Sequence, residues 1–154
     1  MVTKNNIDGK NLKRAICICN INVKRLYNQG YRKLGFVFNT DPHDKPGQHW
    51  IAMYCNLNKG EVNYWDSYGI KPSNEVKRLA RRIIDQAKKI GLNVKFNINK
   101  NKHQYKNSEC GVYSINFIVS QLEGNSFEDT VNNIIDDDNM WKKRRKYFVY
   151  ENEI

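Results

Sequence analysis

Four residues of the types that catalyse acyl transfer follow one another along the chain: His49, Asp66, Gln104 and Cys110. A cysteine thiolate can attack a carbonyl carbon, and a histidine can take the thiol proton and later return it to the leaving group. A carboxylate can hold the imidazole in the required tautomer, and N–H groups can stabilise the oxyanion. The candidate catalytic residues are His49, Asp66 and Cys110. The candidate oxyanion-hole donors are the Gln104 amide and the backbone N–H of Cys110.

The reactivity of Cys110 depends on the helix that we expect after it. Apolar residues recur at helical spacing through residues 112–122, and Ser108 is a candidate N-cap. Cys110 would then lie in the first turn, where unpaired N–H groups and the helix dipole favour a thiolate. Gly111 would leave room for a substrate backbone. The alternative is that Cys110 is a small buried hydrophobic side chain, the commoner role of such a cysteine.

A predicted β-hairpin brings the candidate base and carboxylate together. Residues 49–55 and 61–66 have strand patterns, and turn-forming residues lie between them. Folding this segment about Asn58 sets His49 within about two positions of Asp66. Each residue also has a plainer interpretation, His49 as a partly buried histidine at a strand end and Asp66 as a turn or helix cap.

The remaining patterns predict an α+β fold, with a mixed or antiparallel sheet flanked by helices. Further strands are expected at residues 34–38 and 92–98, and helices at 72–90, 127–135 and 140–148. In the last helix, one face could be packed by Met140, Trp141, Arg144, Tyr147 and Phe148. Residues 15–23 are apolar enough to form an element, which a short helix at 24–27 could close. We expect one domain over residues 1–154, with 1–30 as a poorly defined N-terminal extension.

The net charge of +10 predicts attraction to phosphate backbones, anionic surfaces or an acidic partner. Basic residues on the 72–90 helix could form a solvated surface or an anionic docking face. Those at 142–146 could contact phosphate, act as a nuclear localisation signal, or complement the helix dipole.

Cysteine usage and hydropathy narrow the class of protein. The four cysteines fit no disulfide framework, and the Cys17/Cys19 pair is not followed by a second Cys/His pair at zinc-finger spacing, so we expect neither disulfides nor a metal or other cofactor. No apolar run is long enough to span a membrane or to act as a signal peptide. We therefore expect an intracellular protein without membrane contact.

Three short segments carry a family resemblance. The segments are Gly47-Gln48-His49-Trp50, Tyr64-Trp65-Asp66-Ser67-Tyr68-Gly69, and Gln104 followed by Glu109-Cys110-Gly111. Together they resemble the active-site motifs of the SUMO-specific (ubiquitin-like-protein) protease and adenovirus endopeptidase superfamily. Residues 36–42 and 140–148 look closer to its viral branch in large DNA viruses. The resemblance covers roughly residues 31–150 and suggests a virus-encoded member. Such a member would act in the cytoplasm or nucleus of a host cell or be packaged in a virion.

The resemblance implies an α+β cysteine peptidase that cuts after Gly-Gly or Gly-x-Gly sites in a ubiquitin-like protein or a structural polyprotein. It implies substrate contacts at Gly111 and at Trp50, whose ring would pack over the active site, although an ordinary core tryptophan is the alternative. Ser67 and Gly69 are expected only to shape a turn. Related proteases have a longer region before the histidine than the 48 residues found here, which implies a shortened N-terminal region. Viral relatives can need a peptide or DNA activator, for which the positive charge would suit DNA.

Three further functions stay open. The family also contains ubiquitin-like deconjugases that cut isopeptide bonds. A similar triad transfers acetyl groups in bacterial effectors, which acyl-CoA dependence would reveal. A non-catalytic binder of nucleic acid or a ubiquitin-like protein would instead show salt-dependent binding without thiol reactivity.

Overall fold

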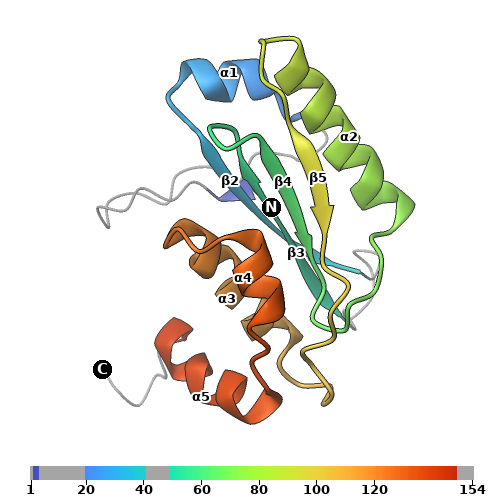
Figure 1. The fold of residues 1–154 in the computed structure, drawn as a ribbon, viewed down its shortest axis with the longest axis vertical. Helices are drawn as coiled ribbons and strands as arrows, with labels where there is room; N and C mark the ends of the chain where they lie inside the picture. Colours follow the sequence, from blue (N-terminus) through green and yellow to red (C-terminus); the bar gives the residue numbers. More distant parts are fainter. Residues whose placement is uncertain (1, 4–19, 41–48, 149–154) are drawn as a thin grey trace.

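A computed structural model describes residues 2–3, 20–40 and 49–148. Its centre is a five-stranded sheet with the strand order β1-β2-β3-β4-β5 (Figure 1). The strands are β1 (Val2–Thr3), β2 (Lys33–Asn39), β3 (Trp50–Asn56), β4 (Glu61–Trp65) and β5 (Lys95–Ile98). The helices are α1 (Val23–Asn28), α2 (Asn74–Lys88), α3 (Cys110–Leu122), α4 (Phe127–Asn132) and α5 (Asp137–Tyr147).

The sheet is mixed. Strands β1 to β4 pair antiparallel, whereas β5 lies parallel to β4 because the chain between them passes through α2. Strands β3 and β4 form the predicted hairpin, with Asn56 opposite Glu61 and Ala52 opposite Trp65. The expectation of a mixed or antiparallel sheet flanked by helices is confirmed.

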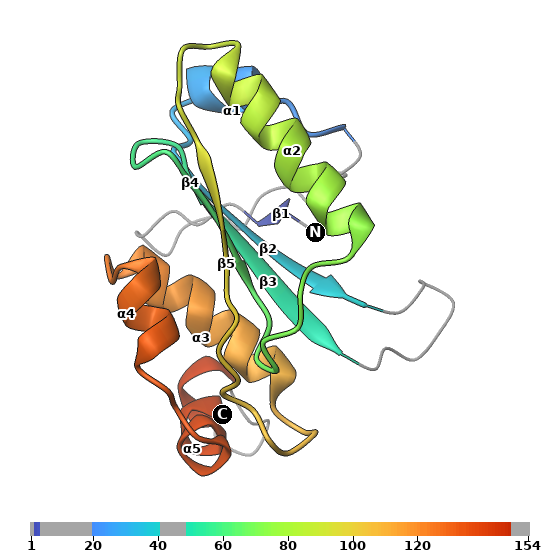
Figure 2. The ribbon, with the colours of Figure 1, turned by 45° about the vertical axis from the view of Figure 1, so that its right-hand side comes forward.

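Helices cover the two faces of the sheet separately (Figure 2). Because successive strand side chains point to opposite faces, Ile51, Met53 and Cys55 of β3 join the core under α1 and α2. Ala52 and Tyr54, from the same strand, join a second core with α3 and Met140 of α5. The β3–β4 hairpin is therefore buried on both faces, which holds its two ends in place.

Helix α2 follows the prediction closely. Ser73 accepts a hydrogen bond from the backbone N–H of Val76 at the first turn, and Gly91 has a φ of 81° just after the helix. The predicted apolar stripe is buried, apart from Ile84 and Ile90, which are half-buried. The six lysine and arginine side chains of its other face are exposed.

Several predicted element limits are wrong. Strand β5 and helix α4 are shorter than expected. The N-cap of α3 is Glu109 rather than Ser108, because the helix begins at Cys110 and Ser108 lies one position too early.

The expected packing of the C-terminal helix is also only partly right. In α5, Met140 is buried and Tyr147 half-buried, but Trp141 is 55% exposed. Phe148, which follows the helix, is 40% exposed. Some expectations concern residues that lie outside the described part of the chain. These residues are the segment 15–19, which includes Cys17 and Cys19, and the pair Gly47-Gln48.

Within the described residues, no helix has the length and apolar character needed to cross a membrane. The same part of the chain has no group of three or more His, Cys, Asp and Glu side chains suited to a metal ion.

Candidate active site

The hairpin brings a histidine to a carboxylate at one end of the sheet. His49 directly precedes β3 and Asp66 directly follows β4, and Nε2 of His49 lies 3.0 Å from Oδ2 of Asp66. The contact is short, although the N–H direction departs from that of a linear hydrogen bond. Both side chains are largely buried, with 15% and 3% of their surface exposed, so water screens the interaction little.

Cys110 is the first residue of α3, and this helix packs along β3. The hydroxyl of Ser114 donates to the carbonyl of Trp50 at 3.1 Å, which ties the second turn of the helix to the start of the strand. The Cys110 thiol consequently lies near the His49 imidazole and near the backbone N–H groups of Trp50 and Gly111. The cysteine is 8% exposed, close to the surface rather than deep in the core.

The neighbours of Cys110 and His49 favour a charged pair. Burial raises the pKa of the Cys110 thiol, but the imidazole and the backbone N–H groups of Trp50 and Gly111 outweigh it, so the pKa lies below that of an ordinary thiol. Burial lowers the pKa of His49, but its side-chain contacts and charge interactions with Asp66 and Cys110 raise it to about 9. Both shifts favour an imidazolium beside a thiolate over the neutral pair.

Gln104 is fully buried, and its amide orientation is fixed from both ends. The hydroxyl of Ser67 donates to Oε1 of Gln104 at 2.6 Å, and Nε2 of Gln104 donates to the carbonyl of Lys106 at 2.6 Å. The backbone N–H groups of His103 and Gln104 also both donate to the carbonyl of Ser67. An amide has two N–H donors, so within the described part of the chain one remains after the bond to Lys106.

Ser67 therefore has a larger role than the turn-shaping one expected of it. It bonds the Gln104 segment through both its side chain and its backbone, while Asp66 next to it contacts His49. The serine directly after the candidate carboxylate was a signal available in the sequence. The partner 37 residues further on was not, because local patterns do not report such a contact.

The loop that carries Gln104 is anchored to α5. Oδ2 of the buried Asp137 accepts hydrogen bonds from the backbone N–H groups of Tyr105 and Lys106, at 2.9 and 3.0 Å. The hydroxyl of Tyr68 donates to the carbonyl of Lys106, and the Tyr68 ring centroid lies 4.9 Å from that of His49. These bonds connect the loop to the catalytic end of the sheet.

Trp50 and Gly111 lie next to each other at the start of β3 and α3. A Cβ added to Gly111 would meet the Trp50 ring at 3.9 Å. Trp50 is 42% exposed, so the alternative of an ordinary core tryptophan is excluded.

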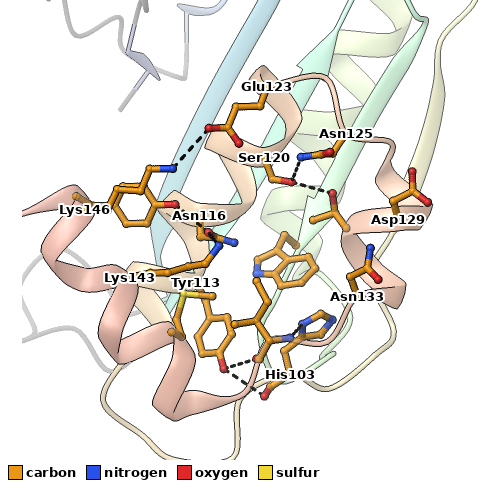
Figure 3. Close-up of a pocket in the computed structure, with 15 residues that line it drawn as sticks. His103, Tyr113, Asn116, Ser120, Glu123, Asn125, Asp129, Asn133, Lys143 and Lys146 are labelled. Atoms are coloured by element: carbon orange, nitrogen blue, oxygen red, sulfur yellow. Dashed lines mark hydrogen bonds and ion pairs between the residues drawn. The ribbon is translucent and has the colours of Figure 1, made fainter.

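A separate pocket of about 220 Å³ lies among α3, α4 and α5 (Figure 3). Its lining includes His103 and Tyr113 but none of the candidate catalytic residues. The chemistry proposed below takes place outside it.

Two viral proteins illustrate the sequence similarity. R355 of Acanthamoeba polyphaga mimivirus, named as a thiol protease, is 35% identical over 136 residues, which are 87% of this chain and 45% of that protein. Cysteine protease S273R of African swine fever virus (isolate Tick/Malawi/Lil 20-1/1983) is 32% identical over 146 residues, 92% of this chain and 48% of that protein. The chain thus spans about half the length of the curated relatives it matches.

Solved structures agree with the fold. The crystal structure of the African swine fever virus pS273R protease matches with a TM-score of 0.76 and 26% identity, over 86% of this chain and 54% of that one. The SUMO protease Ulp1 matches with a TM-score of 0.57 over 80% of this chain and 56% of that one. At 15% identity, this second match shows the fold alone.

The family model described as the Ulp1 protease family, C-terminal catalytic domain, matches residues 36–154, which include the elements that carry His49, Asp66, Gln104 and Cys110. The chain belongs to the Ulp1 protease family.

Proposed function

We propose that the chain is a cysteine endopeptidase domain in which Cys110 is the nucleophile, His49 the general base and acid, and Asp66 the residue that orients the imidazole. The observation that carries the proposal is the 3.0 Å contact between His49 and Asp66 at the end of the hairpin, beside Cys110 at the start of α3. The imidazole and the thiol are close enough for each to shift the pKa of the other. Without these partners a cysteine at this position would be an inert thiol.

The reaction follows from the charged pair. The Cys110 thiolate adds to the carbonyl carbon of the scissile amide, and the imidazolium of His49 gives its proton to the amine that leaves. The products of this step are a thioester on Cys110 and a free amine. Neutral His49 then takes a proton from water, whose oxygen adds to the thioester carbonyl. Collapse releases the carboxylate product and restores the thiolate and imidazolium.

The oxyanion of each tetrahedral intermediate needs preorganised donors. The second N–H of the Gln104 amide and the backbone N–H of Cys110 are the proposed pair. The amide oxygen of Gln104 would repel the oxyanion. Because the Ser67 hydroxyl bonds that oxygen, Oε1, the amide presents an N–H group to the oxyanion instead. Removing one such donor in other enzymes costs about 3 to 4 kcal/mol of barrier.

The proposed substrate has a Gly-Gly or Gly-x-Gly site. Trp50 is exposed beside Gly111, and a narrow channel at this point would accept a backbone without side chains. A viral structural polyprotein is the first candidate substrate, given the viral origin of the curated relatives.

A ubiquitin-like deconjugase is the second candidate function. Some curated relatives from African swine fever virus are named SUMO-1 cysteine protease, and a solved structure with the same fold is a Ulp1 protease domain in complex with Smt3, the yeast ortholog of SUMO. A role for DNA or a peptide activator, and an intracellular site of action, stay predictions.

Three substrates test the proposal in parallel: a peptide with an internal Gly-Gly site, a ubiquitin-like precursor and a ubiquitin-like protein joined to lysine by an isopeptide bond. Mass spectrometry should detect cleavage after glycine by the wild type and none by Cys110→Ala. Cys55→Ala is the matched control, because burial raises the pKa of that thiol to about 12 and makes it unreactive. Cleavage by Cys110→Ala would overturn the proposal, and acyl transfer only with acyl-CoA would assign the triad to an acetyltransferase.

A further inference from the structure

The C-terminal helix contacts the residue that directly precedes the proposed nucleophile. Nη1 of Arg144, on α5, lies 3.2 Å from Oε2 and 3.4 Å from Oε1 of Glu109. Glu109 is 4% exposed, whereas the side chain of Arg144 is 39% exposed. A buried carboxylate thus meets a partly solvated guanidinium.

Glu109 is unusual as the N-cap of α3 because its side chain makes no capping hydrogen bond. Its carboxylate is directed to Arg144 instead. Leaving a buried carboxylate without a cation would be costly, and a negative charge next to Cys110 would also oppose formation of the thiolate. Arg144 offsets both effects.

The position of Arg144 is fixed by other contacts between α5 and α3. Lys143 donates to Oδ1 of Asn116 at 3.1 Å, and Lys146 lies 3.7 Å from Glu123 (Figure 3). The hydroxyl of Tyr147 also donates to Oδ1 of Asn116, at 2.8 Å. The last turn of α5 is therefore docked on α3, and Arg144 is held at the end of α3 that carries Cys110.

We propose that Arg144 is a positioning residue for the nucleophile: by pairing with Glu109 it neutralises the buried carboxylate beside Cys110 and fixes the start of α3. The inference rests on the proposed function, and it assigns α5 a role in positioning the nucleophile. Within the described residues, the other titratable groups that interact with Cys110 are His49 from the start of β3 and Tyr68 from the turn after β4. Tyr68 also interacts electrostatically with Asp137, the first residue of α5.

The test measures how fast iodoacetamide alkylates Cys110 as a function of pH, by mass spectrometry of the Cys110 peptide. Arg144→Met should slow alkylation at pH 7 about threefold or more, because the unpaired carboxylate raises the pKa of the thiol. Arg144→Lys should keep most of the rate. Glu109→Gln/Arg144→Met should restore it, since the charge that opposes the thiolate is gone. Arg145→Met, an exposed neighbour on the same helix, is the matched control and should behave as the wild type.

An alkylation profile of Arg144→Met that matches the wild type would overturn the inference, as would a double variant as slow as Arg144→Met. If Arg144→Met does not fold, the single variant Glu109→Gln tests the inference. Alkylation of this variant at pH 6 at least as fast as that of the wild type supports the inference, and slower alkylation overturns it. The proposed function fails differently, through a Cys110 that titrates as an ordinary thiol in both the wild type and His49→Ala.

Discussion

Nε2 of His49 lies 3.0 Å from Oδ2 of Asp66, although neither residue belongs to a strand. The register of Ala52 with Trp65 places Asp66 opposite Ile51, two residues after His49. The contact is thus set by the hairpin register, and a slip of one residue would turn the two side chains to opposite faces. The geometry of the proposed catalytic pair therefore depends on the sheet.

The pH dependence of hydrolysis should reveal the charged pair. On the acid side activity is lost as the Cys110 thiolate is protonated, at a pH below that of an ordinary thiol. On the alkaline side activity is lost near pH 9, where His49 loses the proton that it gives to the leaving amine. Asp66→Asn should move the alkaline limb to lower pH, because removing the carboxylate charge lowers the pKa of His49. An alkaline limb that does not move would contradict the role of Asp66.

Ser67 should matter for hydrolysis and not for thiol reactivity. Without its hydroxyl the Gln104 amide is held only by its bond to Lys106, so Ser67→Ala should lower hydrolysis about 10- to 100-fold, and Gln104→Ala about 100- to 1,000-fold. Alkylation of Cys110 forms no oxyanion, so its rate should stay within about twofold of the wild type in both variants. Ser108→Ala, at an exposed position in the same loop, is the control. Hydrolysis by Ser67→Ala at the wild-type rate would remove the positioning role.

Alanine substitutions at two glycines should have different effects, one on substrate binding and the other on the stability of the fold. An added Cβ at Gly111 meets only the Trp50 ring at ordinary contact distance, so Gly111→Ala should keep the melting temperature or raise it slightly. It should nevertheless raise KM for a Gly-Gly peptide about tenfold or more, because the methyl group would occupy space beside Trp50 where we propose that the substrate backbone lies.

Gly69→Ala is the contrasting variant. At Gly69 φ is +73° and a Cβ would lie 2.8 Å from the carbonyl oxygen of Lys100, so this change should destabilise the fold by about 1 to 3 kcal/mol. Thermal unfolding and steady-state kinetics measure the two effects. A KM of Gly111→Ala equal to that of the wild type would show that the substrate does not bind beside Gly111.

Much of the fold was predictable because its signals are local. The apolar stripe of α2 and the alternation in β3 and β4 fix element types, and the turn between those strands fixes the hairpin register. That register places His49 near Asp66 before any tertiary contact is known.

What escaped prediction depends on distant contacts. Ser108 looked like a cap, but the true N-cap, Glu109, is held by Arg144 from α5, 35 residues away. The bond from Ser67 to Gln104 likewise joins a turn to a loop 37 residues further on. Residue type and local spacing carry no information on such pairs, since any polar side chain brought nearby by the fold could have taken their place.

The central claim is that His49 activates Cys110 for attack at a glycine carbonyl, and labelling by an electrophile carried at the end of a Gly-Gly peptide tests it most directly. At neutral pH the account predicts one adduct, on Cys110, formed by the wild type and reduced at least about 100-fold in His49→Gln, with Cys55 unlabelled. An adduct formed equally well by His49→Gln, or a folded wild-type protein that is not labelled at Cys110, would contradict it.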